Sequence, residues 1–409
     1  MKIAVIGAKS MPPQQGGIEH VCAELYPRMV AAGHTVDFYT RASSTQQPQN
    51  KRQTYQGVRI ISLPGINFKG LDAFSTSFLG ALFAARGGYD VIHFHAIGPA
   101  LFSAVVKLLS PKSKIVVTCH GLDWQRDKWG KLATKYLRAG EKASVRFADG
   151  LIVVSGNLKD YFWTTYQRES VYIPNAASRY AHSDQSFSFC HQLGLTPKRY
   201  IVFLGRLVPE KRPDLLIRAF EKLQPAGWRL AVVGTASDTS EYATHLKALA
   251  KDQPNIIFTG ELRGPLLAEV MRGSGLFVLP SRLEGMPLAL LEAMAEDIPV
   301  IASDIPPHQS LLEPDRGVLF KTDNLESCVC QLAWALNNPE QMSVLAKNAS
   351  RFIQKNHTWE IATHQTLKLY ETLIARPLDV STYRFDSVSG QPASATNSVA
   401  TYSETSNNK

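Results

Sequence analysis

Short apolar segments that end at a glycine recur along this chain and alternate with helical patterns. Residues 2–6, 200–204, 229–233 and 256–258 form such segments, and a glycine follows each one directly or after one further residue. Apolar runs of this length between helices are typical of parallel strands, which need a crossover connection. Open parallel sheets bind ligands outside the carboxyl ends of their strands, so these glycines mark candidate binding positions. The pattern favours an α/β fold.

The alternation of strand and helix runs through two successive halves of the chain. Helical periodicity is present at 18–29, 102–109 and 215–223. The remaining strand patterns lie at 36–40, 91–95, 115–118, 151–154, 171–175 and 276–279. A parallel α/β unit is therefore expected in each half.

The length of 409 residues suits two domains rather than a single core. We predict an N-terminal domain over 1–178 and a C-terminal domain over 199–356, joined by a polar linker at 179–198. A further helix is expected at 357–376. Residues 377–409 are rich in Ser, Thr and Asn and lack apolar periodicity, so we expect them to be disordered.

Composition narrows the class of protein. Hydrophobic residues make up 44% of the chain and charged residues 19%, which is typical of a globular protein. The net charge of +9 favours anionic partners such as phosphates or an anionic lipid surface. The five cysteines fit neither a disulfide framework nor a zinc site, so we expect reduced thiols and a cytoplasmic location. No apolar stretch reaches the roughly 18–20 residues that span a bilayer.

Two glutamates, Glu284 and Glu292, stand eight residues apart in the second half. Pro287 suits the first turn of a helix, which places Glu284 in the loop before that helix and Glu292 inside it. The helix is apolar around Glu292, so this carboxylate is expected to be buried and to need partners. A sugar diol offers two hydroxyl donors, and the free amides of Gly285 and Met286 suit an anion or sugar oxygens. The alternative is a glutamate paired with a core Arg or Lys.

Two cations, Arg206 and Lys211, lie five residues apart directly after the strand at 200–204. Cations on such a loop can grip a diphosphate and offset the charge that grows on a leaving phosphate. The alternative is a solvated charged loop. No Asp-x-Asp metal motif occurs in the chain, so we expect neither a metal nor another cofactor. Without a metal, Arg206 and Lys211 become more necessary for neutralising the diphosphate.

These motifs resemble glycosyltransferase family 4, which has the two-domain GT-B fold. The resemblance runs over about residues 1–376. It is carried by Gly16-Gly17-Ile18-Glu19, His120-Gly121, Gly205-Arg206 with Lys211, and the glutamate pair in its Pro-Ser-Arg-Leu-Glu-Gly context. It implies two Rossmann-like α/β domains facing a central cleft, with the helix at 357–376 crossing back to the first domain. It also implies sugar transfer from a nucleotide-sugar donor with retention of anomeric configuration.

The resemblance further implies a role for each matching residue. Arg206 and Lys211 would bind the donor diphosphate, and Glu292 would hold the ribose hydroxyls. The catalytic candidates are His120, beside sugar and acceptor, and Glu284, which would position the transferred sugar without acting as a covalent nucleophile. The full donor-binding set comprises Gly16, Gly17, Arg206, Lys211, Gly285, Met286, Pro287 and Glu292.

One of these assignments has an ordinary structural alternative, and one neighbouring residue differs from the family pattern. His120 follows a strand directly, and the alternative for it is an ordinary core histidine. Arg212 stands where the family usually has glycine. It either adds a phosphate contact or closes the turn differently.

A narrower resemblance covers Gly121 to Arg126 and the following Lys128-Trp129-Gly130. These residues are similar to a subgroup of bacterial transferases that includes rhamnosyltransferases of cell-surface polysaccharide assembly. The similarity implies a hexosyl or deoxyhexosyl transfer in polysaccharide biosynthesis.

The segment 126–146 holds seven basic and two acidic residues. Its cations at 128, 131, 135, 138, 142 and 146 recur at spacings of three and four, which predicts one basic stripe on a helix. A basic helix with nearby aromatic residues suits an anionic membrane surface, where a polyprenyl-diphosphate-linked glycan acceptor would meet the enzyme. We therefore expect peripheral binding to the inner face of the membrane. The alternative is a solvated helix face.

Other function classes remain open for the chain. A nucleotide-sugar epimerase can have the same architecture, and a non-catalytic sugar-binding protein can keep a similar fold. Nucleic-acid binding is not expected, because the basic residues are local and no recognised motif occurs.

Overall fold

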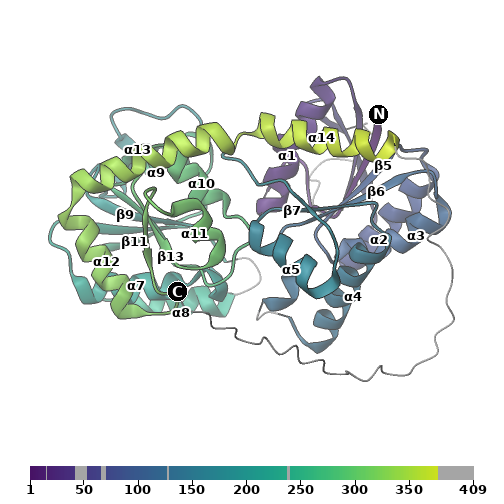
Figure 1. Cartoon of the computed structure of the whole chain (residues 1–409). Helices are drawn as coiled ribbons and strands as arrows, with labels where there is room; N and C mark the ends of the chain where they lie inside the picture. Colours follow the sequence, from purple (N-terminus) through teal and green to yellow (C-terminus); the bar gives the residue numbers. More distant parts are fainter. Residues whose placement is uncertain (15, 42–52, 66–70, 127–128, 237–239, 376–409) are drawn as a thin grey trace, which may run out of the picture. The chain divides into compact units, whose positions relative to one another are not determined.

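The computed structural model describes residues 1–14, 16–41, 53–65, 71–126, 129–236 and 240–375. Within them the chain forms two α/β domains, each built on a largely parallel sheet covered by helices (Figure 1). The predicted fold class is confirmed. The predicted disordered tail at 377–409 and the basic residue Lys128 lie outside the described residues.

The first domain contains an eight-stranded sheet with the order β3-β4-β2-β1-β5-β6-β7-β8. All neighbouring strands are parallel except β3 and β4. The order reverses between β1 and β5, which places a switch point there. The strands are β1 (Lys2–Ile6), β2 (Thr35–Arg41), β3 (Gln53–Tyr55), β4 (Val58–Leu63), β5 (Val91–His95), β6 (Lys114–Cys119), β7 (Gly150–Val153) and β8 (Val171–Tyr172).

The second domain contains a six-stranded, all-parallel sheet with the order β11-β10-β9-β12-β13-β14. Its switch point lies between β9 and β12. Both switch points therefore present strand ends at which a ligand can bind. The strands are β9 (Tyr200–Leu204), β10 (Arg229–Val233), β11 (Ile256–Gly260), β12 (Leu276–Leu279), β13 (Val300–Ser303) and β14 (Val318–Phe320).

Helices connect these strands and cover the sheets. In the first domain they are α1 (Gly17–Ala31), α2 (Leu71–Arg86), α3 (Ser103–Leu109), α4 (Lys131–Phe147) and α5 (Gly156–Tyr166), with short 3₁₀ turns η2 (Pro99–Phe102) and η3 (Asp123–Gln125). The second domain holds α6 (Ser188–Gln192), η4 (Pro209–Lys211), α7 (Pro213–Leu223), α8 (Ser240–Leu249), α9 (Gly264–Gly273), α10 (Leu288–Ala295), α11 (Pro306–Leu312), α12 (Leu325–Asn337) and α13 (Pro339–Asn356). The last helix is α14 (Trp359–Ala375).

Strand β1 shows why the sheets are buried on both faces. Successive side chains of a strand point to opposite faces. Ala4 and Ile6 belong to one apolar cluster, whereas Ile3 and Val5 belong to another on the opposite side. All four are essentially inaccessible to solvent. Burial on both sides is the usual condition of a parallel sheet.

The segment predicted as an irregular linker, 179–198, contains one element. Residues Ser188–Gln192 form α6, and the amide of Cys190 donates to Oε1 of Glu269 on α9 over 2.9 Å. The linker prediction was incomplete because a five-residue helix is too short to show apolar periodicity.

Helix α14 crosses back to the first domain, as predicted, and lies beside α1 (Figure 1). Its inward residues recur at helical spacing and include Trp359, Ala362 and Tyr370. The guanidinium of Arg28 on α1 pairs with Glu360 at 3.2 Å.

The chain thus passes between the domains twice, at 175–178 and at 357–359, and the two passages are bonded to each other. The amide of Ala177 donates to the carbonyl of His357 over 3.2 Å, and the ring of His357 contacts the carbonyl of Asn175 at 3.0 Å. No helix in the described ranges is both long enough and apolar enough to cross a membrane.

Candidate active site

A pocket lies between the strand ends of the two domains. Its first-domain wall follows β6, and its second-domain wall follows β9 and β12. The lining residues are His120, Gly121, Leu122, Arg126, Arg206, Glu210, Lys211, Leu283, Glu284 and Gly285. The pocket therefore brings together four of the residues singled out from the sequence as catalytic or phosphate-binding: His120, Arg206, Lys211 and Glu284.

Lys211 and Glu284 form an ion pair at the floor of this pocket. Nζ of Lys211 lies 2.6 Å from Oε1 of Glu284, and the hydroxyl of Ser281 donates to the same oxygen over 2.7 Å. Burial acts to raise the pKa of Glu284, but the ammonium of Lys211 and the Ser281 hydrogen bond outweigh it and leave that pKa below its ordinary value. Glu284 is therefore a carboxylate at neutral pH.

The guanidinium of Arg206 is not paired with another described residue. It lines the pocket, is partly exposed, and has no hydrogen bond or ion pair with any residue that the structure describes. Arg212, by contrast, pairs with Asp214 at 3.1 Å and with Asp323. It adopts a left-handed conformation with φ of 52°, at the position where a glycine would be unstrained. Arg212 therefore closes the turn and is already paired with carboxylates.

The two domains are in close contact at Gly285. A Cβ atom built on Gly285 would lie 1.8 Å from the carbonyl oxygen of His120. Any side chain there would push the two loops apart, so this contact requires glycine. The side-chain amide of Asn175 adds a second contact between the domains by donating to the carbonyl of Met286 over 3.0 Å.

The N-terminus of α10 points amide groups at this meeting place. Pro287 is the residue before the first helical position, rather than inside the first turn as predicted. The amides of Gly285 and Met286 have no acceptor among the described residues. Free amides at a helix N-terminus favour an anion or electronegative sugar oxygens.

Glu292 lies on α10 and is partly exposed, not fully buried as predicted. The hydroxyl of Tyr180 donates to its Oε2 over 3.2 Å. Burial raises the pKa of Glu292 to about 8, and the Tyr180 hydrogen bond offsets only part of this effect. The expected alternative partner, a core Arg or Lys, is not bonded to Glu292 in the described part of the chain.

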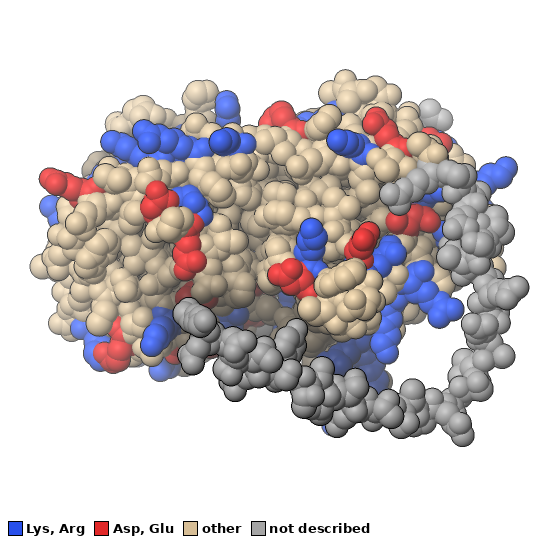
Figure 2. Space-filling model, in the orientation of Figure 1, with Lys and Arg blue, Asp and Glu red and all other residues tan. Residues whose placement is uncertain are grey.

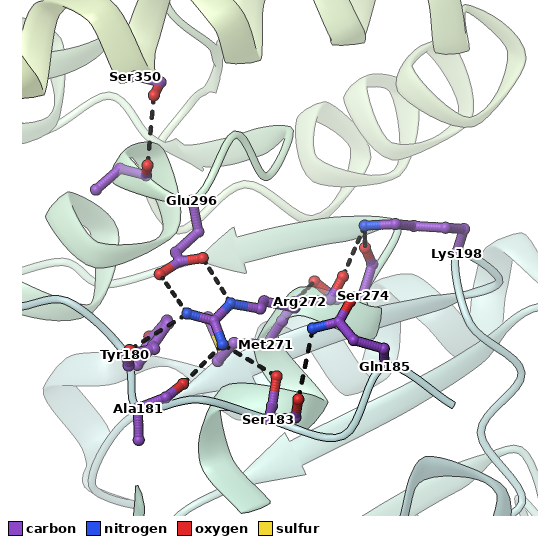
Figure 3. Close-up of polar contacts among 11 residues, drawn as sticks. Tyr180, Ala181, Ser183, Gln185, Lys198, Met271, Arg272, Ser274, Glu296 and Ser350 are labelled. Carbon is purple, nitrogen blue, oxygen red and sulfur yellow. Dashed lines mark hydrogen bonds and ion pairs between the residues drawn. The ribbon is translucent and has the colours of Figure 1, made fainter. Parts of the chain in front are cut away.

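Tyr180 is held by Arg272 of α9 (Figure 3). The guanidinium binds both oxygens of Glu296, at 2.8 and 3.0 Å, in the fork arrangement that fixes geometry best. It also donates to the carbonyls of Tyr180 and Ala181, at 3.3 and 2.7 Å. The connecting segment is thereby fastened to the second domain, and Tyr180 is kept beside Glu292.

Gly16 and Gly17 begin α1 on the first-domain side. Gly16 has a φ of 111°, which favours glycine, and a Cβ there would meet Oε2 of Glu19 at 2.5 Å. A Cβ on Gly17 would only touch Leu288 of α10, at 3.6 Å. Gly17 therefore lies against the N-terminus of α10.

Sequence reasoning missed two charged residues of the pocket, Arg126 and Glu210. Arg126 pairs with Asp123 at 3.2 Å and approaches Oε1 of Glu210 at 3.9 Å. That buried oxygen has no hydrogen-bond partner. Arg126 was noted only within the 121–126 resemblance and as one of the basic residues of 126–146. Its position at the end of a loop that begins with His120 was the available signal.

A buried glutamate anchors this loop to α4. Glu141 accepts hydrogen bonds from the indole of Trp124 at 2.7 Å and from the hydroxyl of Tyr161 at 2.8 Å. The guanidinium of Arg138 lies over the Trp124 ring at 4.4 Å. The loop that carries Arg126 is thus held rigidly on the helix.

The cations predicted as a stripe lie on the outer face of α4. Figure 2 shows Lys and Arg side chains gathered over the region of this helix. The exposed members are Lys131, Lys135, Arg138, Lys142 and Arg146. Leu132, also on α4, is 82% exposed.

Family models match both halves of the chain. A model described as "Glycosyltransferase Family 4" matches residues 15–178, and one described as "Glycosyl transferases group 1" matches residues 191–352. Together they extend over most of the chain.

Individual relatives agree with these matches. The chain is 28% identical over 308 residues to a GDP-mannose:cellobiosyl-diphosphopolyprenol alpha-mannosyltransferase of Komagataeibacter xylinus, covering 71% of this chain and 74% of that enzyme. Sucrose-phosphate synthase of Thermosynechococcus elongatus has a TM-score of 0.79 at 22% identity, covering 91% of this chain and 99% of that chain. HepE of Anabaena, solved with UDP and glucose, has a TM-score of 0.75 at 18% identity, covering 91% and 100%. The two structures share the fold.

Proposed function

This chain belongs to glycosyltransferase family 4, and on that premise we propose that it moves a sugar from a nucleotide-sugar donor to a glycan or lipid-linked glycan with retention of anomeric configuration. It is a glycosyltransferase with the GT-B fold. The proposal concerns the donor, the acceptor, the stereochemistry and the residues that act.

The pocket with charges from both domains carries the proposal. Arg206 and Lys211 supply positive charge beside two free amides of α10, and a diphosphate matches that combination. We assign Arg206 and Lys211 to the donor diphosphate. Electrostatic stabilisation by fixed donors is the largest contribution in many group transfers, and we propose that these donors act without a metal.

The carboxylates are assigned to hydroxyl groups of the donor. Glu292 holds the ribose diol, whose two hydroxyls donate to the oxygens of its carboxyl group. Glu284 and the amides of Gly285 and Met286 hold the transferred sugar near its reacting carbon. Glu284 is ionised and already bonded to Lys211, so its role is positioning and charge stabilisation rather than covalent attack. His120 contacts the sugar and the acceptor from the first domain.

The acceptor is proposed from the first domain's outer face. The basic face of α4, with exposed Leu132 beside it, suits an anionic membrane surface. The Komagataeibacter relative bears the name of an enzyme that acts on a diphosphopolyprenol-linked glycan. We propose a polyprenyl-diphosphate-linked acceptor in cell-surface polysaccharide biosynthesis, with the enzyme peripheral on the cytoplasmic side. The transferred group is a hexosyl or deoxyhexosyl unit such as rhamnosyl, as the 121–130 resemblance favours.

A two-step experiment tests this function. UDP-, GDP- and dTDP-sugars are first screened by thermal shift, because a ligand that binds only the folded protein raises its melting temperature. The stabilising donor is then mixed with polyprenyl-diphosphate-linked glycans, and release of free nucleoside diphosphate is measured. Release that depends on the acceptor supports transfer. Conversion of the donor to its epimer without an acceptor would establish the isomerase instead, and binding without turnover would establish a sugar-binding protein.

A further inference from the structure

Three histidines lie on one face of the first-domain sheet. His93 and His95 are two residues apart on β5 and therefore share a face. On the neighbouring strand, Thr118 lies opposite His95, and His120 follows two residues later on the same face. Helices α1 and α14, which lie side by side in Figure 1, cover these rings with Tyr26 and Tyr370.

Short contacts connect His120 to the interior of the domain. Nε2 of His120 lies 2.9 Å from Nδ1 of His95, and Nε2 of His95 lies 2.5 Å from the hydroxyl of Tyr26. The rings of His95 and His120 are stacked with centroids 5.2 Å apart. A chain of three groups therefore runs from α1 to the edge of the pocket.

His93 belongs to a second branch of the hydrogen-bonded cluster. Its Nδ1 lies 2.5 Å from the hydroxyl of Tyr370 and 2.9 Å from that of Tyr26, and its Nε2 lies 2.7 Å from Oγ1 of Thr118. An imidazole nitrogen has one proton or one lone pair, so Nδ1 can share only one proton at a time. The shorter contact favours Tyr370 as the partner of Nδ1, and the shortest printed contact of the Tyr26 hydroxyl is the one to His95 at 2.5 Å.

The direction of the chain follows from acidity. Burial lowers the pKa of His93 to about 3 and that of His120 to about 4, and it also lowers the pKa of His95. All three rings are neutral near pH 7, so each has one N–H. A phenol is a stronger acid than a neutral imidazole N–H, so Tyr26 donates to Nε2 of His95. His95 must then donate from Nδ1 to Nε2 of His120.

The remaining nitrogen of His120 faces a ligand-accessible region. Since Nε2 accepts a hydrogen bond, the single proton of His120 lies on Nδ1. Nδ1 has no hydrogen-bond partner among the described residues, and it is not one of their buried, unpaired atoms. His120 lines the pocket that also contains Arg206 and Glu284.

We propose that Tyr26, acting through His95, holds His120 as its Nδ1–H tautomer, so that His120 presents a hydrogen-bond donor to the transferred sugar. Tyr26 and His95 are then positioning residues, and only His120 contacts substrate. The benefit to turnover rests on the proposed function of the pocket, whereas the tautomer itself does not. Without the Tyr26 hydroxyl, His95 can carry its proton on Nε2, and His120 is free to turn from donor to acceptor.

Nuclear magnetic resonance of protein with ¹⁵N-labelled histidine tests the tautomer directly, because two-bond couplings distinguish Nδ1–H from Nε2–H. His120→Gln identifies the His120 signals. We expect the Nδ1–H pattern in the wild-type protein and a shift toward Nε2–H in Tyr26→Phe. Tyr39→Phe is the matched control, since it removes a buried phenol hydroxyl of the same domain that contacts Tyr89 at 3.0 Å and none of the three histidines. It should leave the His120 signals unchanged.

The spectra need no substrate, so they test this inference separately from the donor and acceptor. An Nε2–H pattern for His120 in the wild-type protein overturns it, and so does a Tyr26→Phe spectrum with His120 unchanged. With an active donor and acceptor, Tyr26→Phe should lower kcat about tenfold and leave the donor KM within about twofold, as expected for the loss of one hydrogen bond made in the transition state. An unchanged kcat with an altered tautomer would overturn the positioning role.

Discussion

Nζ of Lys211 donates a hydrogen bond to Oε1 of Glu284 over 2.6 Å and joins the cation of η4 to the carboxylate that precedes α10. Both side chains are mostly shielded from solvent, at 16% and 11% exposure. Removing one partner of such a pair leaves the other as an uncompensated charge. In the proposed reaction, a donor diphosphate would share Lys211 with Glu284, so the pair would couple phosphate binding to sugar positioning.

Lys211→Ala is expected to lower turnover by at least ~10²-fold, because one fixed electrostatic stabiliser of the leaving phosphate is lost. Steady-state kinetics with the identified donor measures this effect. Lys222→Ala is the matched control, since Lys222 pairs with Glu326 on the exposed surface and exposed pairs contribute little. Near-normal turnover of Lys211→Ala would contradict the phosphate role.

The same substitution changes the pH dependence. In the wild-type protein Lys211 keeps the pKa of Glu284 below its ordinary value. Without the ammonium, burial dominates and raises that pKa, so Glu284 becomes protonated at a higher pH. The acid limb of the kcat/KM profile should therefore move to higher pH in Lys211→Ala. An acid limb at the same pH would show that Glu284 does not need to be ionised.

Glu292→Ala should weaken donor binding, because the proposed acceptor of the ribose hydroxyls is removed. Calorimetric titration of the donor measures the change, and a loss of about tenfold or more is expected for two hydroxyl contacts. Glu340→Ala, an exposed glutamate in the first turn of α13, is the control. A donor dissociation constant equal to the wild-type value would refute the assignment.

Glu292 also predicts a pH-dependent stability. Its folded-state pKa of about 8 exceeds that of an unfolded glutamate, roughly 4.3. The protonated carboxyl therefore stabilises the fold fully below about pH 4, and this stabilisation is lost as pH rises through about 8. Glu292→Gln keeps a neutral group at every pH. Its melting temperature should exceed the wild-type value most at about pH 9 and least at about pH 5, and a constant difference would contradict the raised pKa.

Gly285→Ala should reduce turnover sharply, because its Cβ would lie 1.8 Å from the carbonyl oxygen of His120. The two loops must separate, which misplaces His120 relative to Glu284. Gly156→Ala is the control, since a Cβ there meets no atom within 4 Å. Kinetics and melting temperature are compared, and the activity loss should exceed the loss of stability. Wild-type activity in Gly285→Ala would show that the domains do not need this contact.

The basic face of α4 predicts salt-sensitive binding to anionic vesicles. Replacing Lys131, Lys135 and Lys142 by Glu should abolish flotation with vesicles that contain anionic lipid, and about 1 kcal/mol of attraction is lost for each cation. The control replaces Lys347, Arg351 and Lys355 of α13, exposed cations of the other domain, by Glu. Wild-type protein that stays unbound at low salt would rule out the membrane surface.

Much of the fold could be predicted because its signals are local. Strand patterns such as 91–95 and 200–204 coincide with β5 and β9, and apolar strands followed by glycine indicated the binding edge. The strands β3, β4, β13 and β14 were not predicted, because Gln53–Tyr55 is polar and the apolar runs of the other three are at most three residues long. The predicted linker likewise concealed α6.

The residues of the candidate site were identified by their type, but the contacts between them were not predicted. Lys211 and Glu284 were identified separately, and only the fold reveals that they contact each other. The His93–His95 alternation was visible in the sequence, yet its partners Tyr26 and Tyr370 lie far away along the chain. Glu292 was expected to be buried because the residues around it on α10 are apolar, whereas the structure leaves it partly exposed beside Tyr180.

The two passages of the chain between the domains limit how those domains can move. Two domains joined by a single connecting segment can rotate about any axis. Two connecting segments that are hydrogen-bonded to each other leave chiefly one rotation, about the line that joins the segments. The bonds between Ala177 and His357 and between His357 and Asn175 create that condition. Opening would then carry the His120 carbonyl away from Gly285 along a single arc, and closing would return it to the same position in every catalytic cycle.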